Sequence, residues 1–348
     1  MPAIEVTELT KVFRTKQKAA GLKGSLRALV RPRMAVIEAV RGISFSVEEG
    51  ELVGFIGPNG AGKSSTLKIL TGILHPTSGQ ARVLGLVPWQ ERRRLAYRIG
   101  SVFGQRPQLW YHLPAIDTFR LFGRIYEVEP ALLRRRLDRL VEVLEIGELL
   151  ETPVRKLSLG QRLRCEVAAS LLHGPRLLLL DEPSIGLDVV AKQRLRDAIR
   201  QLNEEEGMSV LLTSHDAGDI EALCSRVIVV NHGRIVFEDE VAALKRRYLT
   251  AKQVEARYEH ELPGDFHVPG GEVVRLDRYE VTLRFDARRV SAGAVMAQLA
   301  AAGGLVDVTL SEPSLEEVIR AMYQESGQES KQEPEPRKTA VVPAGAGP

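Results

Sequence analysis

The sequence predicts an α/β fold with a mainly parallel sheet, followed by a small α+β domain. Between residues 51 and 240, short apolar runs alternate with stretches of helical periodicity, as in strands joined by helical crossovers. One run, residues 177–180, is Leu throughout, which is typical of a parallel strand buried on both faces. After residue 248 several short strand patterns dominate. We therefore expect a first domain over residues 4–247, a second over residues 248–323, and a disordered polar tail over residues 324–348.

The individual elements follow from local apolar patterns. A strand at residues 51–56 leads into a glycine-rich loop and then a helix at residues 63–74. Strands at residues 4–6 and 39–47 flank an insert, residues 15–35, and residues 106–172 are expected to form a helical subdomain. Further elements of the first domain are predicted as helices at residues 130–150, 158–173, 189–206 and 217–224, and strands at 177–180, 209–213, 227–230 and 234–238. The second domain is predicted to hold strands at residues 254–258, 272–276, 280–285 and 306–310, and helices at 291–302 and 315–323.

The composition is that of an ordinary globular protein. The chain has 348 residues, of which 44% are hydrophobic and 27% charged, and its formal net charge is +3. This low charge and the 5% aromatic content argue against nucleic-acid binding as the main function. We expect no signal peptide and no run of about 20 apolar residues that could span a bilayer. Cys165 and Cys224 make no disulfide framework, which favours a reducing cytoplasm.

The glycine-rich loop carries the first chemical signal. Its sequence is Gly57-Pro58-Asn59-Gly60-Ala61-Gly62-Lys63-Ser64, which fits the pattern G-x4-G-K-[ST]. Gly57 and Gly62 let the backbone wrap closely, so that amide hydrogens at the start of the helix point at phosphates. Lys63 is expected to reach the β- and γ-phosphates, and the Ser64 hydroxyl is expected to ligate Mg²⁺. Ser65 is also expected to belong to the ATP-binding residues. The alternative is a structural glycine turn, but the strand–loop–helix setting favours an ATP site.

Two adjacent carboxylates follow the predicted strand at residues 177–180. Asp181 fits the position associated with Mg²⁺. Glu182 is the candidate general base, because a base must lie within one water of the γ-phosphate. Leu-rich strands that end in Asp-Glu are common, so the functional interpretation depends on the glycine-rich loop earlier in the chain.

Four further motifs complete a pattern that resembles the ABC ATPases. Leu157-Ser158-Leu159-Gly160-Gln161 resembles the family's signature motif, and Gln105 in Val102-Phe103-Gly104-Gln105 resembles its Q-loop. Gly186-Leu187-Asp188 is similar to the D-loop, and His215 in Leu212-Thr213-Ser214-His215-Asp216 to the switch histidine. The resemblance covers roughly residues 4 to 240 with six ordered motifs. It implies a P-loop ABC-type ATPase domain, and the C-terminal domain loosely resembles the appendage of drug- and polysaccharide-type ABC exporter ATPases.

The resemblance also implies roles for these residues. ATP would lie between two subunits arranged head to tail, with Ser158, Gly160 and Gln161 of one subunit closing over the γ-phosphate held by the other. A helix start of this kind favours an anion. His215 would hold the γ-phosphate and orient Glu182, and Asp188 would belong to the D-loop. The expected catalytic residues are Lys63, Gln105, Glu182 and His215, and the expected metal ligands are Ser64, Gln105 and Asp181.

Phe13 resembles the family's adenine-stacking aromatic, a contact that contributes about 1–3 kcal/mol. The alternative is a core Phe on an early strand. The sequence also departs from the family pattern. Leu159 stands where Gly is usual in the signature, Ile185 replaces a small polar residue near the D-loop, and the insert at residues 15–35 is long.

Two surface segments suggest partners. Residues 11–36 contain eight basic residues and no acidic one, so this segment is either a solvated arm or a contact for anionic lipid, at about 1 kcal/mol for each Lys or Arg. The run Leu109-Trp110-Tyr111-His112-Leu113-Pro114 concentrates aromatics, which suits either a partner groove or local packing of the helical subdomain.

These observations lead to one main hypothesis. We expect an ATP-hydrolysing subunit of an ABC transporter, with exporter the expected direction, peripheral on the cytoplasmic side of the membrane. It would form a homodimer or heterodimer and drive a separate transmembrane permease. The alternatives are a non-transport ABC ATPase acting on DNA or the ribosome, and a binding module with an inactive site. Residues Lys63, Ser64, Asp181, Glu182 and His215 argue against the inactive site.

Overall fold

The computed structural model describes residues 2–16, 34–103, 107–248, 251–311, 315–319 and 322–323. Gln105, most of the predicted insert and the predicted tail at residues 324–348 lie outside the described residues. The chain divides into two compact units, Met1–Arg247 and Tyr248–Pro348. None of the described helices is long and apolar enough to cross a membrane.

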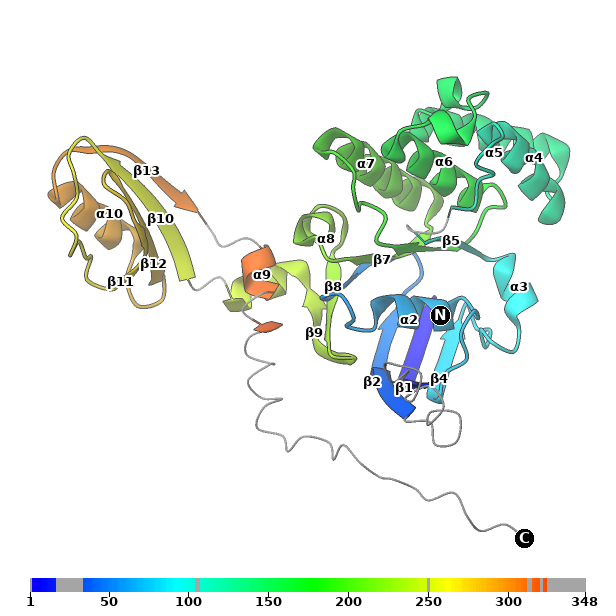
Figure 1. Cartoon of the computed structure of the whole chain (residues 1–348), viewed down its shortest axis with the longest axis horizontal. Helices are drawn as coiled ribbons and strands as arrows, with labels where there is room; N and C mark the ends of the chain where they lie inside the picture. Colours follow the sequence, from blue (N-terminus) through cyan, green and yellow to red (C-terminus); the bar gives the residue numbers. More distant parts are fainter. Residues whose placement is uncertain are drawn as a thin grey trace, which may run out of the picture. The chain divides into compact units, whose positions relative to one another are not determined.

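The main sheet of the first unit has six strands in the order β5-β6-β7-β3-β8-β9 (Figure 1). In that order the strands are β5 (Ile99–Phe103), β6 (Leu177–Asp181), β7 (Ser209–Ser214), β3 (Leu52–Ile56), β8 (Arg226–Asn231) and β9 (Arg234–Glu240). Neighbouring strands are parallel except β8 and β9. The expected mainly parallel sheet is therefore confirmed. Its central strands β3 and β7 are buried along their whole length. This burial explains the apolar sequence of β3 and the apolar centre of β7, residues 210–212.

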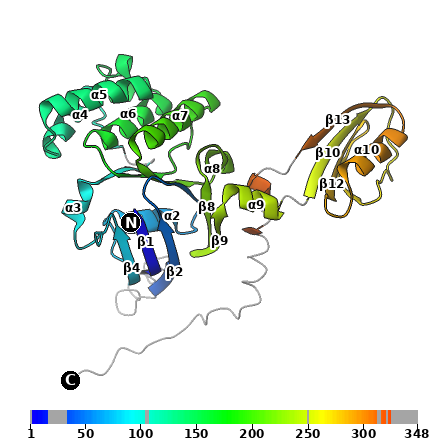
Figure 2. The same cartoon turned by 180° about the vertical axis from the view of Figure 1, so that it is seen from behind.

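Helices cover both faces of this sheet (Figures 1 and 2). On one side lie α4, α5, α6 and α7, and on the other lies α2. The helices of this unit are α2 (Lys63–Leu70), α3 (Arg92–Ala96), α4 (Ala115–Ile125), α5 (Pro130–Leu144), α6 (Leu159–Leu171), α7 (Val189–Glu206), α8 (Ala217–Leu223) and α9 (Val241–Tyr248), with 3₁₀ turns at Gly147–Leu149 and Val154–Lys156. Two predicted helices end early because a residue in the left-handed region stops each: Gly72 has φ 71° beyond α2, and Glu145 has φ 50° at the end of α5.

A second, antiparallel sheet of the first unit contains β2, β1 and β4 in that order. Its strands are β1 (Ile4–Lys16), β2 (Met34–Val47) and β4 (Ser78–Val83). The predicted strands at residues 4–6 and 39–47 were too short, because β1 and β2 stay paired out to Lys16 and Met34. The ends of the predicted insert thus belong to strands, although the local sequence gives no clear strand pattern there.

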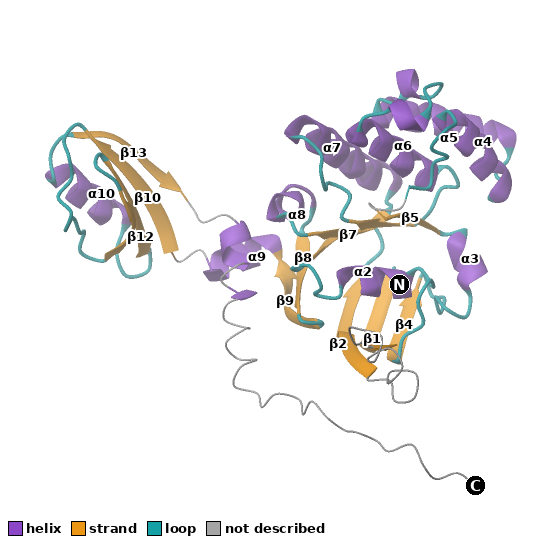
Figure 3. Cartoon of the chain, in the orientation of Figure 1, coloured by secondary structure: helices purple, strands orange, loops and turns teal. Residues whose placement is uncertain are grey.

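The second unit is a four-stranded antiparallel sheet with one helix packed against it (Figure 3). The strand order is β11 (Gly271–Leu276), β12 (Glu280–Asp286), β10 (Ala251–Tyr258) and β13 (Leu305–Ser311). Helix α10 (Ala292–Ala301) contributes Val295 and Leu299 to the core that it shares with Val254 and Leu283. Residues 315–319 and 322–323 are helical.

Candidate active site

The residues expected to carry chemistry meet at the carboxyl ends of three neighbouring strands. The phosphate loop, residues 57–64, follows β3. Asp181 is the last residue of β6 and Glu182 comes directly after it, and His215 follows β7. Because β6, β7 and β3 are adjacent and parallel, their carboxyl ends lie at one edge of the sheet. This topology brings together segments more than 100 residues apart in the chain.

The phosphate loop needs glycine at two positions. Gly62, which precedes α2, has φ 107°, and a Cβ there would lie 2.3 Å from the carbonyl oxygen of Ala39. A Cβ on Gly57 would lie 2.4 Å from the carbonyl oxygen of Val230. Only glycine fits either position without displacing backbone. The loop that results is partly open to solvent, with Asn59 and Gly60 exposed, Pro58, Ser64 and Ser65 half-buried, and Ala61 buried.

Lys63 places a buried positive charge inside this loop. Its side chain is 5% exposed, and its Nζ donates to the carbonyl oxygen of Gly57 at 2.6 Å. The same Nζ forms an ion pair with Oε1 of Glu182 at 3.0 Å. A buried ammonium requires such partners, and these also fix its position at the mouth of the loop.

Asp181 is held by two hydroxyl groups. Its Oδ1 accepts from Ser64 Oγ at 3.0 Å and from Thr213 Oγ1 at 2.8 Å. The oxygens of Ser64 and Asp181 are hard donors of the kind that bind Mg²⁺ together with substrate phosphates and water. This pair of donors therefore fits the expected cation. Thr213, which is fully buried, was not predicted as a site residue.

Glu182 lies between a lysine and a histidine. Its Oε2 lies 2.5 Å from Nδ1 of His215 and accepts from the His215 backbone N–H at 3.2 Å, while Oε1 faces Lys63. The backbone of Glu182 is in the left-handed region, with φ 54°, and its N–H donates to the carbonyl and hydroxyl oxygens of Thr213. A non-glycine residue in this region marks a constrained position of the kind found at functional sites.

A buried polar cluster supports the two loops that carry Glu182 and His215. Asp219, in the first turn of α8, is 2% exposed and accepts hydrogen bonds from Ser184 and, at 3.0 Å, from Ser214. Arg196 of α7 donates two further bonds to it, at 2.5 and 3.0 Å. Ser184 comes two residues after Glu182, and Ser214 directly precedes His215. The sequence offered one indication that Asp219 is buried: it lies between the apolar residues Ala217 and Ile220, which are both buried.

The predicted signature residues begin α6. Ser158 is the N-cap: its Oγ accepts from the Gln161 N–H at 3.2 Å, and its own N–H donates to Gln161 Oε1 at 2.9 Å. Asp188 is the N-cap of α7, and its Oδ1 accepts from the Ala191 N–H at 2.8 Å. Within the described part of the chain, no hydrogen bond or ion pair joins Ser158, Gly160, Gln161 or Asp188 to the phosphate loop.

Phe13 lies on β1, opposite Ile37 of β2. Its ring is half-buried, and the Nζ of Lys11 lies 5.2 Å from the ring centroid. Phe13 therefore lies on an early strand with part of its ring accessible to solvent.

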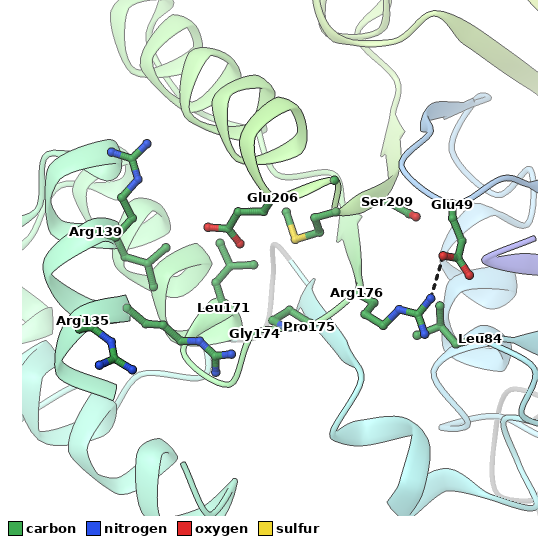
Figure 4. Close-up of a pocket in the computed structure, with 14 residues that line it drawn as sticks. Glu49, Leu84, Arg135, Arg139, Leu171, Gly174, Pro175, Arg176, Glu206 and Ser209 are labelled. Atoms are coloured by element: carbon green, nitrogen blue, oxygen red, sulfur yellow. Dashed lines mark hydrogen bonds and ion pairs between the residues drawn. The ribbon is translucent and has the colours of Figure 1, made fainter. Parts of the chain in front are cut away.

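A pocket of about 420 Å³ lies at the opposite end of the strands, where β6 and β7 begin (Figure 4). Arg135, Arg136, Arg139 and Arg176 line it beside the last residues of α6 and α7. Arg136 donates to the carbonyl oxygen of Leu172, and Arg176 pairs with Glu49 at 2.7 Å. Cations at helix carboxyl ends are stabilised by exposed carbonyl groups and the helix dipole, so we interpret this pocket as a structural feature rather than a nucleotide site.

The fold and the phosphate loop define a P-loop nucleotide-binding domain. Residues 40–185 match the family described as ABC transporter. The ATP-binding protein NatA of Bacillus subtilis is 30% identical over 223 residues, which cover 64% of this chain and 89% of NatA. The Nod factor export ATP-binding protein I of Ralstonia nicotianae is 33% identical over 234 residues, 67% of this chain and 72% of that protein.

Solved structures show the same fold. The dimeric ATP-binding cassette MJ0796 bound to ADP and Pi superposes with a TM-score of 0.57 at 23% identity, covering 68% of this chain and 98% of that one. The chain therefore belongs to the ATP-binding proteins of ABC transporters and is an ABC ATPase, as its motifs predicted.

Proposed function

We propose that this chain binds ATP on residues 57–65 and hydrolyses it with Glu182 as the general base. The observation that carries this proposal is the cluster formed by Lys63, Glu182 and His215, joined by contacts of 3.0 and 2.5 Å. Lys63 offers a positive charge to the β- and γ-phosphates, and the loop amides at the start of α2 offer hydrogen bonds to them.

Each group of the cluster has a defined part in the reaction. The carboxylate of Glu182 accepts a proton from the attacking water as the water oxygen bonds to the γ-phosphorus. The bond from that phosphorus to the β,γ-bridging oxygen breaks, so that ADP leaves and phosphate is formed. His215 holds that carboxylate through Nδ1 and directs it toward the γ-phosphate position. Ser64 and Asp181, joined by Gln105, would hold Mg²⁺, which supplies charge neutralisation for the phosphates.

The active unit is a head-to-tail dimer. In one subunit the start of α6 is capped by Ser158 and Gln161, and it offers a hydroxyl and helix amides to an anion. Within the described part of the chain, no hydrogen bond or ion pair joins this surface to the phosphate loop, so we assign the γ-phosphate that it binds to a second subunit. Two copies of this chain, or this chain and a relative, can each provide both halves.

A separate membrane permease is the proposed partner, with the chain on the cytoplasmic side of the membrane and transport in the outward direction. One relative is named as a Nod factor export protein, and the outward direction of transport is carried over from that name as part of this proposal. Trp110, Tyr111 and Leu113 are 48%, 52% and 39% exposed, while Leu109 before them is buried. Exposed aromatics of this kind suit a groove on a partner protein. Contact of residues 11–36 with anionic lipid is part of the same proposal, because eight of these residues are basic and none is acidic.

Substitution of two residues tests the reaction. Lys63→Ala should abolish ATP binding or hydrolysis, and Glu182→Gln should retain ATP and accumulate a closed dimer, measured as phosphate release and as dimer mass. Glu204→Gln, an exposed carboxylate on α7, is the matched control and should turn over normally. Substantial phosphate release by the Glu182→Gln protein would refute the assignment of the base.

A pull-down tests the partner. Family membership favours the transporter over a DNA or ribosome ATPase. Co-purification of an integral membrane protein with the tagged chain is the expected result, whereas consistent recovery of nucleic acid would support the alternative.

A further inference from the structure

One buried hydroxyl group joins the two acidic residues of the proposed site. Thr213 is 0% exposed and lies in β7, directly opposite Asp181 of β6 in the register of the sheet. Its Oγ1 donates to Oδ1 of Asp181 at 2.8 Å and accepts from the backbone N–H of Glu182 at 3.1 Å. The carbonyl oxygen of Thr213 accepts from the same N–H at 3.1 Å. The metal-site residue and the proposed base are therefore both held by one residue.

The direction of these hydrogen bonds is fixed by the fold. A hydroxyl group has one hydrogen to donate, and the lone pair of the Thr213 hydroxyl is taken by the N–H of Glu182. Its hydrogen is therefore directed to Asp181. The side chain of a threonine is branched at Cβ, which restricts its χ1 angle, and solvent does not reach this one. Thr213 is thus a pre-oriented donor to Asp181.

The hydrogen bonds to Asp181 are divided unequally between its two oxygens. Oδ1 accepts from both Thr213 and Ser64, the latter at 3.0 Å. Among the described residues, Oδ2 has no hydrogen-bond or ion-pair partner, and it is not enclosed by the protein. Rotation of the carboxylate would break both bonds to Oδ1. Oδ2 is therefore the oxygen of Asp181 that is still able to bind a cation.

Glu182 depends on Thr213 in a different way. Its backbone is in the left-handed region, with φ 54°, which is unfavourable for a residue with a long side chain. Its N–H is held there by two oxygens of Thr213, the carbonyl and the hydroxyl. Loss of the hydroxyl would remove one of the two bonds to this N–H and, at the same time, one of the two bonds to Oδ1 of Asp181.

We propose that Thr213 is a positioning residue for ATP hydrolysis. It orients Asp181 so that Oδ2 can bind the cation of the nucleotide, and it holds the backbone of Glu182 so that the base faces the γ-phosphate position. This inference rests on the proposed function, in which Asp181 belongs to the metal site and Glu182 is the base. Because Thr213 is fully buried, it acts through these two residues and offers no surface to ATP.

The test compares two variants of the full chain at saturating Mg²⁺. Thr213→Val removes the hydroxyl and keeps the shape of the side chain, whereas Thr213→Ser keeps the hydroxyl. Partners that orient a metal ligand change metal affinity or activity by about 10–100-fold when they are substituted. Thr213→Val should therefore lower kcat for phosphate release about tenfold or more, while the KM for ATP changes by less than about threefold. Thr213→Ser should retain at least about a third of the parent kcat, because it keeps both hydrogen bonds of the hydroxyl.

Cation binding gives a second readout that does not depend on turnover. Mn²⁺ is the probe, and its affinity for the ATP-bound protein is measured by electron paramagnetic resonance titration in the Glu182→Gln background. Addition of Thr213→Val should weaken this affinity about tenfold or more, and addition of Thr213→Ser should not. Binding of a fluorescent ATP analogue without divalent cation should be unchanged, because Lys63 keeps its contacts with the phosphate loop.

The matched control is Thr118→Val in α4. Thr118 is also 0% exposed, and its Oγ1 accepts from the backbone N–H of Trp110 at 3.3 Å, so this substitution removes a comparable buried hydroxyl elsewhere in the first unit. Its kcat and Mn²⁺ affinity should equal those of the parent. Urea unfolding followed by circular dichroism shows whether each variant is folded. If Thr213→Val does not fold, Thr213→Ala removes the same hydroxyl in a smaller side chain and is measured in its place.

The possible results separate this inference from the proposed function. A parent-like kcat and Mn²⁺ affinity in Thr213→Val, beside an inactive Glu182→Gln protein, would overturn the role of Thr213 alone. Equal losses in Thr213→Val and Thr213→Ser would also overturn it, since they would assign the effect to the shape of the side chain rather than to its hydroxyl. Normal phosphate release by the Glu182→Gln protein would instead refute the proposed base, and this inference together with it.

Discussion

The cluster around Asp219 makes a quantitative prediction about both stability and turnover. Asp219 is 2% exposed and accepts two bonds from Arg196, whose side chain is 17% exposed. Asp219→Ala removes the carboxylate and leaves a largely buried guanidinium without its counter-charge. Breaking a buried ion pair in this way lowers the free energy of unfolding by about 3–5 kcal/mol. Asp219→Asn keeps an oxygen that can accept from the two serines but loses the negative charge. It should lower the free energy of unfolding by about 1.5–3 kcal/mol.

Urea denaturation followed by tryptophan fluorescence measures these costs. Trp89 and Trp110 are the two tryptophans of the chain, and both lie in the first unit, so the signal reports that unit alone. The matched control is Asp197→Asn on α7, an exposed carboxylate 57% accessible to solvent. It should change the free energy of unfolding by less than about 0.5 kcal/mol.

Turnover separates a positioning role from a merely structural one. Ser184 and Ser214 flank the loops of Glu182 and His215, so Asp219→Asn should lower kcat while the KM for ATP changes little. A double-mutant cycle with Arg196→Met should show a coupling of about 0.5–3 kcal/mol. A loss of stability in Asp219→Ala no larger than that of Asp197→Asn, or a normal kcat in Asp219→Asn, would refute this reasoning.

Three further predictions concern single sites. Gly62→Ala should lower ATP affinity at least about tenfold in calorimetric titration, because φ 107° and the carbonyl of Ala39 exclude a Cβ. Burial lowers the pKa of His173 to about 4, whereas an unfolded histidine titrates near pH 6.5, so the unfolded state binds more protons below that value. The neutral ring of His173 therefore makes its full contribution to the free energy of unfolding above pH 6.5. Denaturant titrations should show that this free energy falls by about 2 kcal/mol between pH 7 and pH 5. The same fall in the His173→Phe protein would contradict this prediction. Burial raises the pKa of the Cys165 thiol to about 12 and that of Cys224 as well, so neither should react with a thiol reagent at pH 8 until the chain is unfolded.

Local sequence determines some parts of this fold and site more strongly than others. The strand before the phosphate loop and the strand at residues 177–180 are recognisable because central parallel strands are uniformly apolar. The outer parts of β1 and β2 were missed, because their pairing at residues such as Phe13 and Ile37 depends on a partner strand rather than on local pattern. Local pattern therefore identified the buried central strands better than strand length, and the strands β4 and β5 were not predicted at all.

The same distinction holds for the site. Lys63, Asp181, Glu182 and His215 follow from motifs, and the structure brings them together. Asp219 was not predicted, since a carboxylate at the start of a helix ordinarily indicates a solvated cap, and its burial depends on Arg196 from another helix. Leu159 and Ile185 likewise line one small cavity, although 26 residues separate them in the sequence.

The central place of β3 in the main sheet has a consequence for biosynthesis. Its neighbours on the two sides are β7 and β8, so the strand that leads to the phosphate loop gains its partners from residues 209–231. At about 5–20 residues per second, a ribosome needs roughly 10–30 s to make the intervening chain. During that interval the segment Leu-Val-Gly-Phe-Ile is a nascent apolar strand with both edges unpaired. The yield of folded protein should therefore depend on chaperone protection of this early segment rather than of the later helices. Slower translation before residue 209 should increase aggregation.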